Sequence, residues 1–159
     1  MKKYAFTLLL ALMAVNIHCQ AIEKKEEALK TKQISLKEKG GLLRNDIKLE
    51  AKRVENLPMS EVSKVMRRIF LKHIPIDIDF DSAEQVLRNA GFAISLMGKQ
   101  LNVSKKEDAV YLSATLFKIT ESGFILKAPL NLYAQLYPKQ EGVFNSMSRI
   151  EIFVDSPLP

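Results

Sequence analysis

The chain has 159 residues, of which 47% are hydrophobic and 26% are charged, with one cysteine, two histidines and a formal net charge of +6. This length suits one domain of ordinary size, or a signal segment followed by one small domain. The six glycines and six prolines exclude collagen-like and low-complexity chains. A single cysteine excludes a disulfide framework within the chain and a multi-cysteine metal cage.

Residues 1–21 have the three-part composition of a secretory signal peptide. Lys2 and Lys3 form its basic start, an apolar stretch follows, and no acidic residue occurs before residue 23. The stretch is shorter than the roughly 20 residues of a membrane span. We therefore expect cleavage between Ala21 and Ile22, a periplasmic or secreted bacterial protein, and no transmembrane span in the mature chain.

Two alternatives to cleavage at Ala21 are an uncleaved anchor and a bacterial lipoprotein signal in which Cys19 becomes lipidated. A lipoprotein signal needs a Leu-like residue three positions before the cysteine and then two small residues. This chain has Asn16, Ile17 and bulky His18 instead, which argues against lipidation.

Residues 22–58 are rich in Lys and Glu, with ten basic and seven acidic side chains. Gly40 and Gly41 are expected to interrupt any helix here, since each glycine costs about 1 kcal/mol in a helix interior. This composition predicts a mobile, partly helical arm. The arm is either a solvated linker or a segment that makes weak contact with anionic lipid or an acidic partner.

Residues 59–159 form the expected folded domain, with twelve basic and eleven acidic side chains. This near-neutral balance argues against a nucleic-acid partner. A helix is predicted from Ser60 to Pro75, on the stripe Val62, Val65, Met66 and Ile69. A second helix is predicted from Asp81-Ser82, with Gln85 completing a capping box and Gly91 in the left-handed conformation after its end.

Apolar and polar residues alternate with period two in the rest of the chain. The alternation predicts strands over 93–97, 110–117, 126–136 and 150–154, with turns at 121–123 and 138–142. Pro129 on the outward side predicts an edge position or a bulge. The expected fold is α+β: two helices packed on one face of a three- to five-stranded antiparallel meander, preceded by the signal peptide and the arm.

Three sequence features suggest chemistry, and none is followed by a complete motif. Asp77, Asp79 and Asp81 have the spacing of a calcium loop, but the Gly and Glu that such a loop requires are missing further on, so we expect no metal. His73 could be a general base oriented by Glu61 or these aspartates, yet no nucleophile motif accompanies it. Residues 102–104 match a glycosylation triplet. The sequence has no phosphate-binding loop that would indicate a nucleotide, so no cofactor is expected.

Aromatic residues on the outward sheet face are the remaining candidate site. They are Tyr111, Phe117, Tyr133, Tyr137 and Phe153. Exposed aromatic side chains in one patch are typical of a surface that binds a partner. The alternative is that the arm or a further helix covers them.

The segment from Ile74 to Phe92, a proline, a short link, an acid-capped helix and Gly-Phe, resembles a unit of small exported bacterial proteins. The order of two helices and then a meander is similar to outer-membrane assembly lipoproteins of the SmpA/OmlA type and to β-lactamase-inhibitor-like domains. The resemblance implies no functional residue. We expect a non-catalytic protein that binds another protein or an envelope component; an inhibitor or immunity-type protein and a carboxylate-based hydrolase are the alternatives.

The first testable prediction is that the exported protein begins at Ile22. The small side chains of Cys19 and Ala21 occupy the two positions that signal cleavage requires. Intact-mass spectrometry of the exported product checks it, and a species that starts at a lipidated Cys19 contradicts it.

Overall fold

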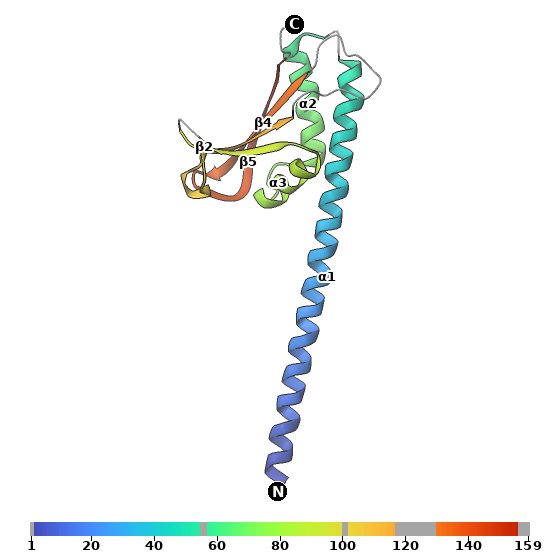
Figure 1. The fold of residues 1–159 in the computed structure, drawn as a ribbon, viewed down its shortest axis with the longest axis vertical. Coiled ribbons are helices and arrows are strands. Elements are labelled where there is room, and N and C mark those ends of the chain that lie inside the picture. The colour runs from blue at the N-terminus through green and yellow to red at the C-terminus, as the bar shows by residue number, and fades with distance from the viewer. Residues whose placement is uncertain (1, 55–56, 100–101, 117–129, 156–159) are drawn as a thin grey trace. The chain divides into compact units, whose positions relative to one another are not determined.

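A computed structural model describes residues 2–54, 57–99, 102–116 and 130–155, with residues 2–26 and 28 as backbone only. Three helices precede the sheet (Figure 1): α1 (Lys2–Arg53), α2 (Met59–His73) and α3 (Phe80–Asn89). The strands are β1 (Ala93–Met97), β2 (Asn102–Val103), β3 (Tyr111–Leu116), β4 (Asn131–Gln140) and β5 (Val143–Asp155), with a 3-10 turn η1 (Lys106–Asp108) before β3. The predicted α+β class is confirmed.

The chain divides into two compact units, residues 1–35 and residues 36–159. The first consists of the N-terminal part of α1, in which the described side chains of Leu29 and Ile34 are exposed. No helix within the described residues combines the length and the apolar character needed to cross a membrane. The remaining paragraphs concern the second unit.

The sheet has the order β2-β1-β3-β4-β5, and every neighbouring pair is antiparallel. The strands β1, β3, β4 and β5 follow one another across the sheet, as in the predicted meander, whereas the unpredicted β2 lies outside β1 at the edge. Leu112 pairs with Leu136, which pairs with Ile150 in β5, and all three are buried. Because side chains alternate between the two faces of a strand, these pairs fix which face of each strand enters the core.

The hairpin between β4 and β5 is tighter than the sequence predicts. β4 continues through Pro138 to Gln140, and only Glu141 and Gly142 form the turn, with Gly142 at φ +71°. Pro138 is accommodated because the pairing shifts there, forming an irregularity in the register with β5. The predicted turn over 138–142 is therefore wrong in extent, and the predictions for 121–123 and Pro129 lie outside the described residues.

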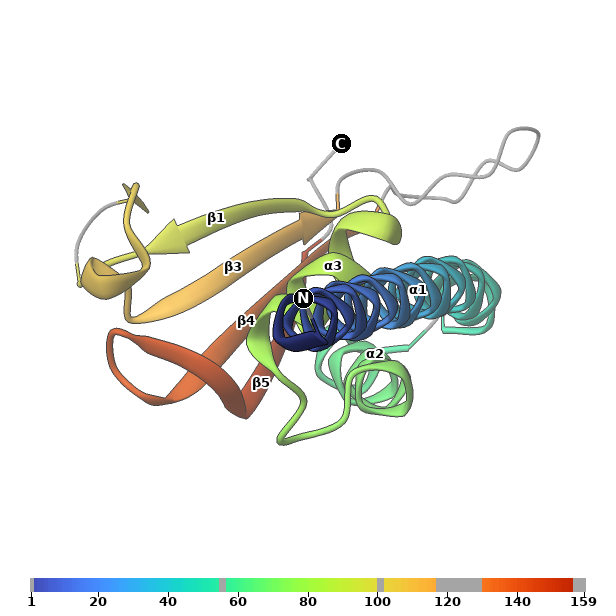
Figure 2. The same cartoon turned by 90° about the horizontal axis from the view of Figure 1, so that it is seen from below.

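Helices α2 and α3 lie against the inward face of the sheet (Figure 2), α2 against β5 and α3 against β5 and β1. Both are amphipathic, as predicted. Edge-to-face ring contacts join these layers: Phe70 meets Phe92 with centroids 5.6 Å apart, and Phe80 meets Phe144 at 4.5 Å. Such pairs stabilise the fold by about 0.5–1.5 kcal/mol beyond the contribution of the area that the rings bury.

Both ends of α3 have defined caps. Its N-cap is Asp79, whose carboxylate accepts a 2.8 Å hydrogen bond from the Ser82 amide. The capping box predicted from Ser82 to Gln85 is therefore wrong, because the N-cap lies three residues before Ser82. At the other end Gly91 has φ +92°, and the Phe92 amide donates to the Leu87 carbonyl at 3.0 Å. This is a Schellman cap, which confirms the role predicted for Gly91.

The sequence-based division at residue 58 differs from the structure, because α1 continues through Gly40 and Gly41 to Arg53. The predicted interruption at the glycine pair is wrong. Residues 36–54 belong to the same compact unit as the sheet and bury a stripe along α1. The stripe consists of Leu36, Gly40, Leu43, Ile47, Ala51 and Val54. The core is thus covered by three helices rather than two.

Gly40 and Gly41 have opposite surroundings, which yields a matched pair of variants. A Cβ at Gly40 would lie 2.4 Å from Asn89 Cβ and 2.8 Å from the Val86 carbonyl oxygen, whereas a Cβ at Gly41 would meet nothing within 4 Å. We expect Gly40→Ala to lower the free energy of unfolding by about 1–3 kcal/mol through overpacking.

The control is Gly41→Ala, which should raise the free energy of unfolding by up to about 1 kcal/mol through helix propensity. Urea denaturation followed by circular dichroism measures both. Equal effects of the two substitutions would show that α1 does not pack on α3 at Gly40.

Candidate protein-binding face of the sheet

The outward face of the sheet carries rows of side chains that run across the strands. One row joins Thr115 of β3 to Tyr133 of β4 and Phe153 of β5 by direct register, and a second joins Ser113 to Gln135 and Glu151. In the described part of the chain, α2 and α3 pack on the opposite face of the sheet (Figure 2), and the side chains of these rows are half-buried or exposed. The described side chains of this face are therefore at least partly open to solvent.

A third row is held by ring and cation contacts. The rings of Tyr111 and Tyr137 lie with centroids 5.3 Å apart and planes inclined by 35°. Arg149 pairs with Tyr137 across the strands, and its guanidinium carbon lies 4.0 Å from the Tyr137 ring centroid. Arg149 Nε also lies 3.3 Å from a Glu151 carboxylate oxygen. These contacts restrict the rotamers of four side chains before any partner arrives.

The Tyr137 hydroxyl lies between two acceptors. It is 2.8 Å from Gln135 Oε1 and 3.3 Å from Glu151 Oε2, and its single proton serves both. Partial burial, and then the neighbouring Glu151 carboxylate, raise the pKa of the Tyr137 hydroxyl above its usual 10. The group is therefore neutral at physiological pH and acts as a hydrogen-bond donor rather than as a base.

Phe153 is the most exposed aromatic side chain on the face. Nearly half of its surface, 48%, is open to solvent, although its strand neighbour Tyr133 is half-buried. The face thus carries an exposed ring, held aromatics and a fixed cation in separate rows, and aromatics and Arg are enriched in protein-binding surfaces.

The structure brings four of the five predicted aromatic residues onto one face: Tyr111, Tyr133, Tyr137 and Phe153. Phe117 lies outside the described residues. Sequence reasoning missed Arg149 and Glu151, although both alternate with buried Ile150 and Ile152 and could have been assigned to the outward face by period two. Ala21 and Ile22 lie in the backbone-only part of α1.

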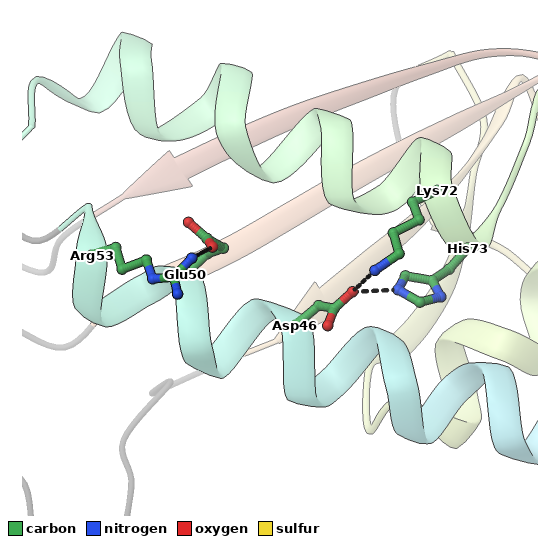
Figure 3. Close-up of polar contacts among 5 residues, drawn as sticks. All are labelled: Asp46, Glu50, Arg53, Lys72 and His73. Carbon is green, nitrogen blue, oxygen red and sulfur yellow. Dashed lines mark hydrogen bonds and ion pairs between the residues drawn. The ribbon is translucent and has the colours of Figure 1, made fainter.

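The predicted general base His73 belongs to a polar cluster between α1 and α2 (Figure 3). Its Nε2 lies 2.8 Å from Asp46 Oδ2, and the Lys72 ammonium donates to the same oxygen at 2.8 Å. The partner of His73 is thus Asp46 of α1. It is neither Glu61, which pairs with Lys64, nor any of the three predicted aspartates. His73 is only 6% exposed, and Asp46 holds it at the helix interface.

A surface groove of about 480 Å³ runs beside this cluster. Its lining residues are Asp46, Leu49, Glu50, Arg53, Val65, Arg68, Ile69 and Lys72. None of them is a hydroxyl or thiol nucleophile, and the His73 ring is absent from the lining. The Asp46–His73 pair therefore fits a structural role, linking α1 to α2.

The three aspartates with calcium-loop spacing go to separate partners. Asp77 binds the Lys139 ammonium at 2.6 Å, Asp81 binds the Lys106 ammonium at 2.5 Å, and Asp79 caps α3. In the described part of the chain no three potential metal-ligating side chains converge. The spacing reflects a helix start and two surface ion pairs.

No protein-family model, curated protein or solved structure matches this chain. The resemblance in element order to exported lipoproteins and β-lactamase-inhibitor-like domains therefore gains no support from these comparisons. The residues of the face carry the functional argument alone.

The Asp46 cluster predicts a pH dependence of stability. Hydrogen bonds from Lys72 and then from His73 lower the pKa of Asp46 below its usual 3.8. A carboxylate whose pKa is lower in the folded state stabilises above the unfolded value, and this contribution is lost as the pH falls through the folded pKa. Asp46→Asn should cost on the order of 1–2 kcal/mol at pH 7, and the difference from the wild type should shrink below about pH 4.

Glu61→Gln is the matched control, because Glu61 forms an exposed pair with Lys64 on α2. Such pairs contribute about 0–1 kcal/mol. Chemical denaturation at several pH values measures both variants. A constant Asp46→Asn difference from pH 7 to pH 3 would contradict the prediction.

Proposed function

We propose that the chain is an exported, non-catalytic bacterial protein that binds another protein of the envelope through the outward face of its sheet. The single observation that carries the proposal is the aromatic surface formed by Tyr111, Tyr133, Tyr137 and Phe153 on β3, β4 and β5. Aromatic rings give a large contact area with few rotors to immobilise, so they dominate the binding energy of protein interfaces.

The order within the face supports binding to a protein. Tyr137 is held by Tyr111, Arg149 and two acceptors, while Phe153 stays exposed opposite Tyr133, two rows further along the same face. The face therefore combines a rigid polar part with an exposed apolar ring. This resembles an interface anchor with hydrogen-bonding groups around it. Side chains already fixed in the free protein lose less entropy when a partner covers them.

The location follows from the N-terminal segment. A basic start, an apolar stretch and small residues at positions 19 and 21 favour export, with Ile22 as the first residue of the mature chain. In that product the sequence contains no cysteine, which suits an oxidising compartment. Residues 22–35 of the arm remain available for weak contact with anionic lipid.

The test is quantitative capture of envelope proteins by the purified chain and by variants. Tyr133→Ser combined with Phe153→Ser removes two neighbouring rings of the face. We expect the double variant to lose about thirtyfold or more in affinity for the captured protein, as expected for the loss of a hot spot of about 2 kcal/mol or more.

Ile76→Ser is the control, because Ile76 is 40% exposed on the segment before α3 and lies outside the face. It should retain the partner at wild-type affinity. Circular dichroism establishes that each variant is folded. A folded double variant that binds as tightly as Ile76→Ser would overturn the proposal, and a captured enzyme whose turnover falls on binding would point to an inhibitor.

A further inference from the structure

Strand β5 forms one edge of the sheet, and among the described residues a backbone segment pairs with only the first half of that edge. The segment before α3 lies along its first half: the Asp77 amide donates to the Met147 carbonyl at 3.1 Å, and the Met147 amide donates to the Ile78 carbonyl at 3.1 Å. Beyond this point no described strand pairs with residues 149–155 on the outer side. An open edge of this length is a template for another strand.

The backbone groups at the open edge belong to alternate residues. In an antiparallel ladder, successive residues direct their amide and carbonyl groups to opposite sides of the strand. On this side the Ile150 carbonyl accepts from Arg67 Nε of α2 at 3.4 Å, as expected for a group outside the ladder with β4, and an added strand would replace this contact. The same side then carries the groups of Ile152 and Val154, two residues and four residues further on.

We propose that the occupant of this edge is a second copy of the same chain, whose β5 pairs antiparallel with the first around a twofold axis at Ile152. In this register Ile150 pairs with Val154 of the second copy, so the edge-directed groups meet one another. On the outward face Arg149 lies opposite Asp155 of the second copy, and the symmetry forms this pair twice. Opposite charges directly across two strands stabilise the pairing.

Charge selects this register over its neighbours. An axis at residue 151 places Glu151 opposite Glu151 of the second copy, and an axis at residue 153 places Glu151 opposite Asp155. Like charges directly opposite are destabilising. An axis at residue 150 requires the edge at Met147, which Asp77 and Ile78 already occupy. A register shifted by one residue would pair a residue whose backbone groups point to the edge with a residue whose groups point to β4.

Arg149 is positioned to receive a second carboxylate. It lies over the Tyr137 ring and beside Glu151 on the outward face, and a guanidinium has five N–H donors. Asp155 is an exposed residue at the end of β5, paired in register with Asn131. Pairing would join the outward faces of the two copies in one continuous sheet. It would extend the proposed binding surface, but the dimer does not depend on that function.

Sedimentation velocity of the purified protein over a range of concentrations tests the inference. The wild-type protein should show a concentration-dependent dimer. Arg149→Glu and Asp155→Arg should each weaken the dimer by about tenfold or more, because each reverses two cross-strand pairs. The combined variant R149E/D155R restores opposite charges across the interface and should regain the dimer.

Lys99→Glu is the control for an unrelated change of charge, since Lys99 is exposed beyond the end of β1, and it should dimerise like the wild type. Circular dichroism verifies the fold of each variant, and Asp155→Arg, at the strand end, keeps the test valid if Arg149→Glu fails to fold. A wild-type chain that stays monomeric, a dimer unaffected by either single change, or single changes that the combined variant does not rescue would each overturn the proposal.

Discussion

At Gly40 the backbone of α1 approaches α3 so closely that a side chain of even one carbon would collide with Asn89 and the Val86 carbonyl. This approach allows Leu43 and Ile47, one and two turns further along, to reach full burial. The same alignment places Asp46 against His73 and Lys72 at the end of α2. The missing Cβ at Gly40 thus allows α1 to pack closely on α3.

The sequence predicted the sheet better than the first helix. Period-two alternation identified the buried faces of β3, β4 and β5, because a strand with one covered face must alternate. The helical spacing of apolar residues identified α2 and α3, whose stripes are short and uninterrupted. The helix over residues 36–53 was missed because propensity treats Gly40 as a breaker, whereas packing on α3 requires the glycine. The stripe Leu36, Leu43, Ile47 and Val54 was the available signal.

The sequence could predict which residues belong to the aromatic face but not which contacts they make across the strands. Alternation alone placed Tyr133, Tyr137 and Phe153 outward, yet it says nothing about which residues of other strands lie beside them. The contact of Tyr111 with Tyr137 depends on the register of β3 with β4, and that of Arg149 with Tyr137 depends on the register of β4 with β5. Register across strands is set by the assembled sheet, so a local pattern could not reveal these contacts.

The two edges of the sheet differ greatly in length. β5 has 13 residues, whereas the strand at the far edge, β2, has 2 and pairs only with Leu96 and Met97. A very short edge strand offers few hydrogen bonds to an incoming chain. The β2 strand therefore offers fewer hydrogen bonds to a further chain than β5 does, so edge-to-edge addition would be weaker there than at β5. The sheet thus has a long edge strand, β5, and a very short one, β2. This difference favours a closed assembly over aggregation.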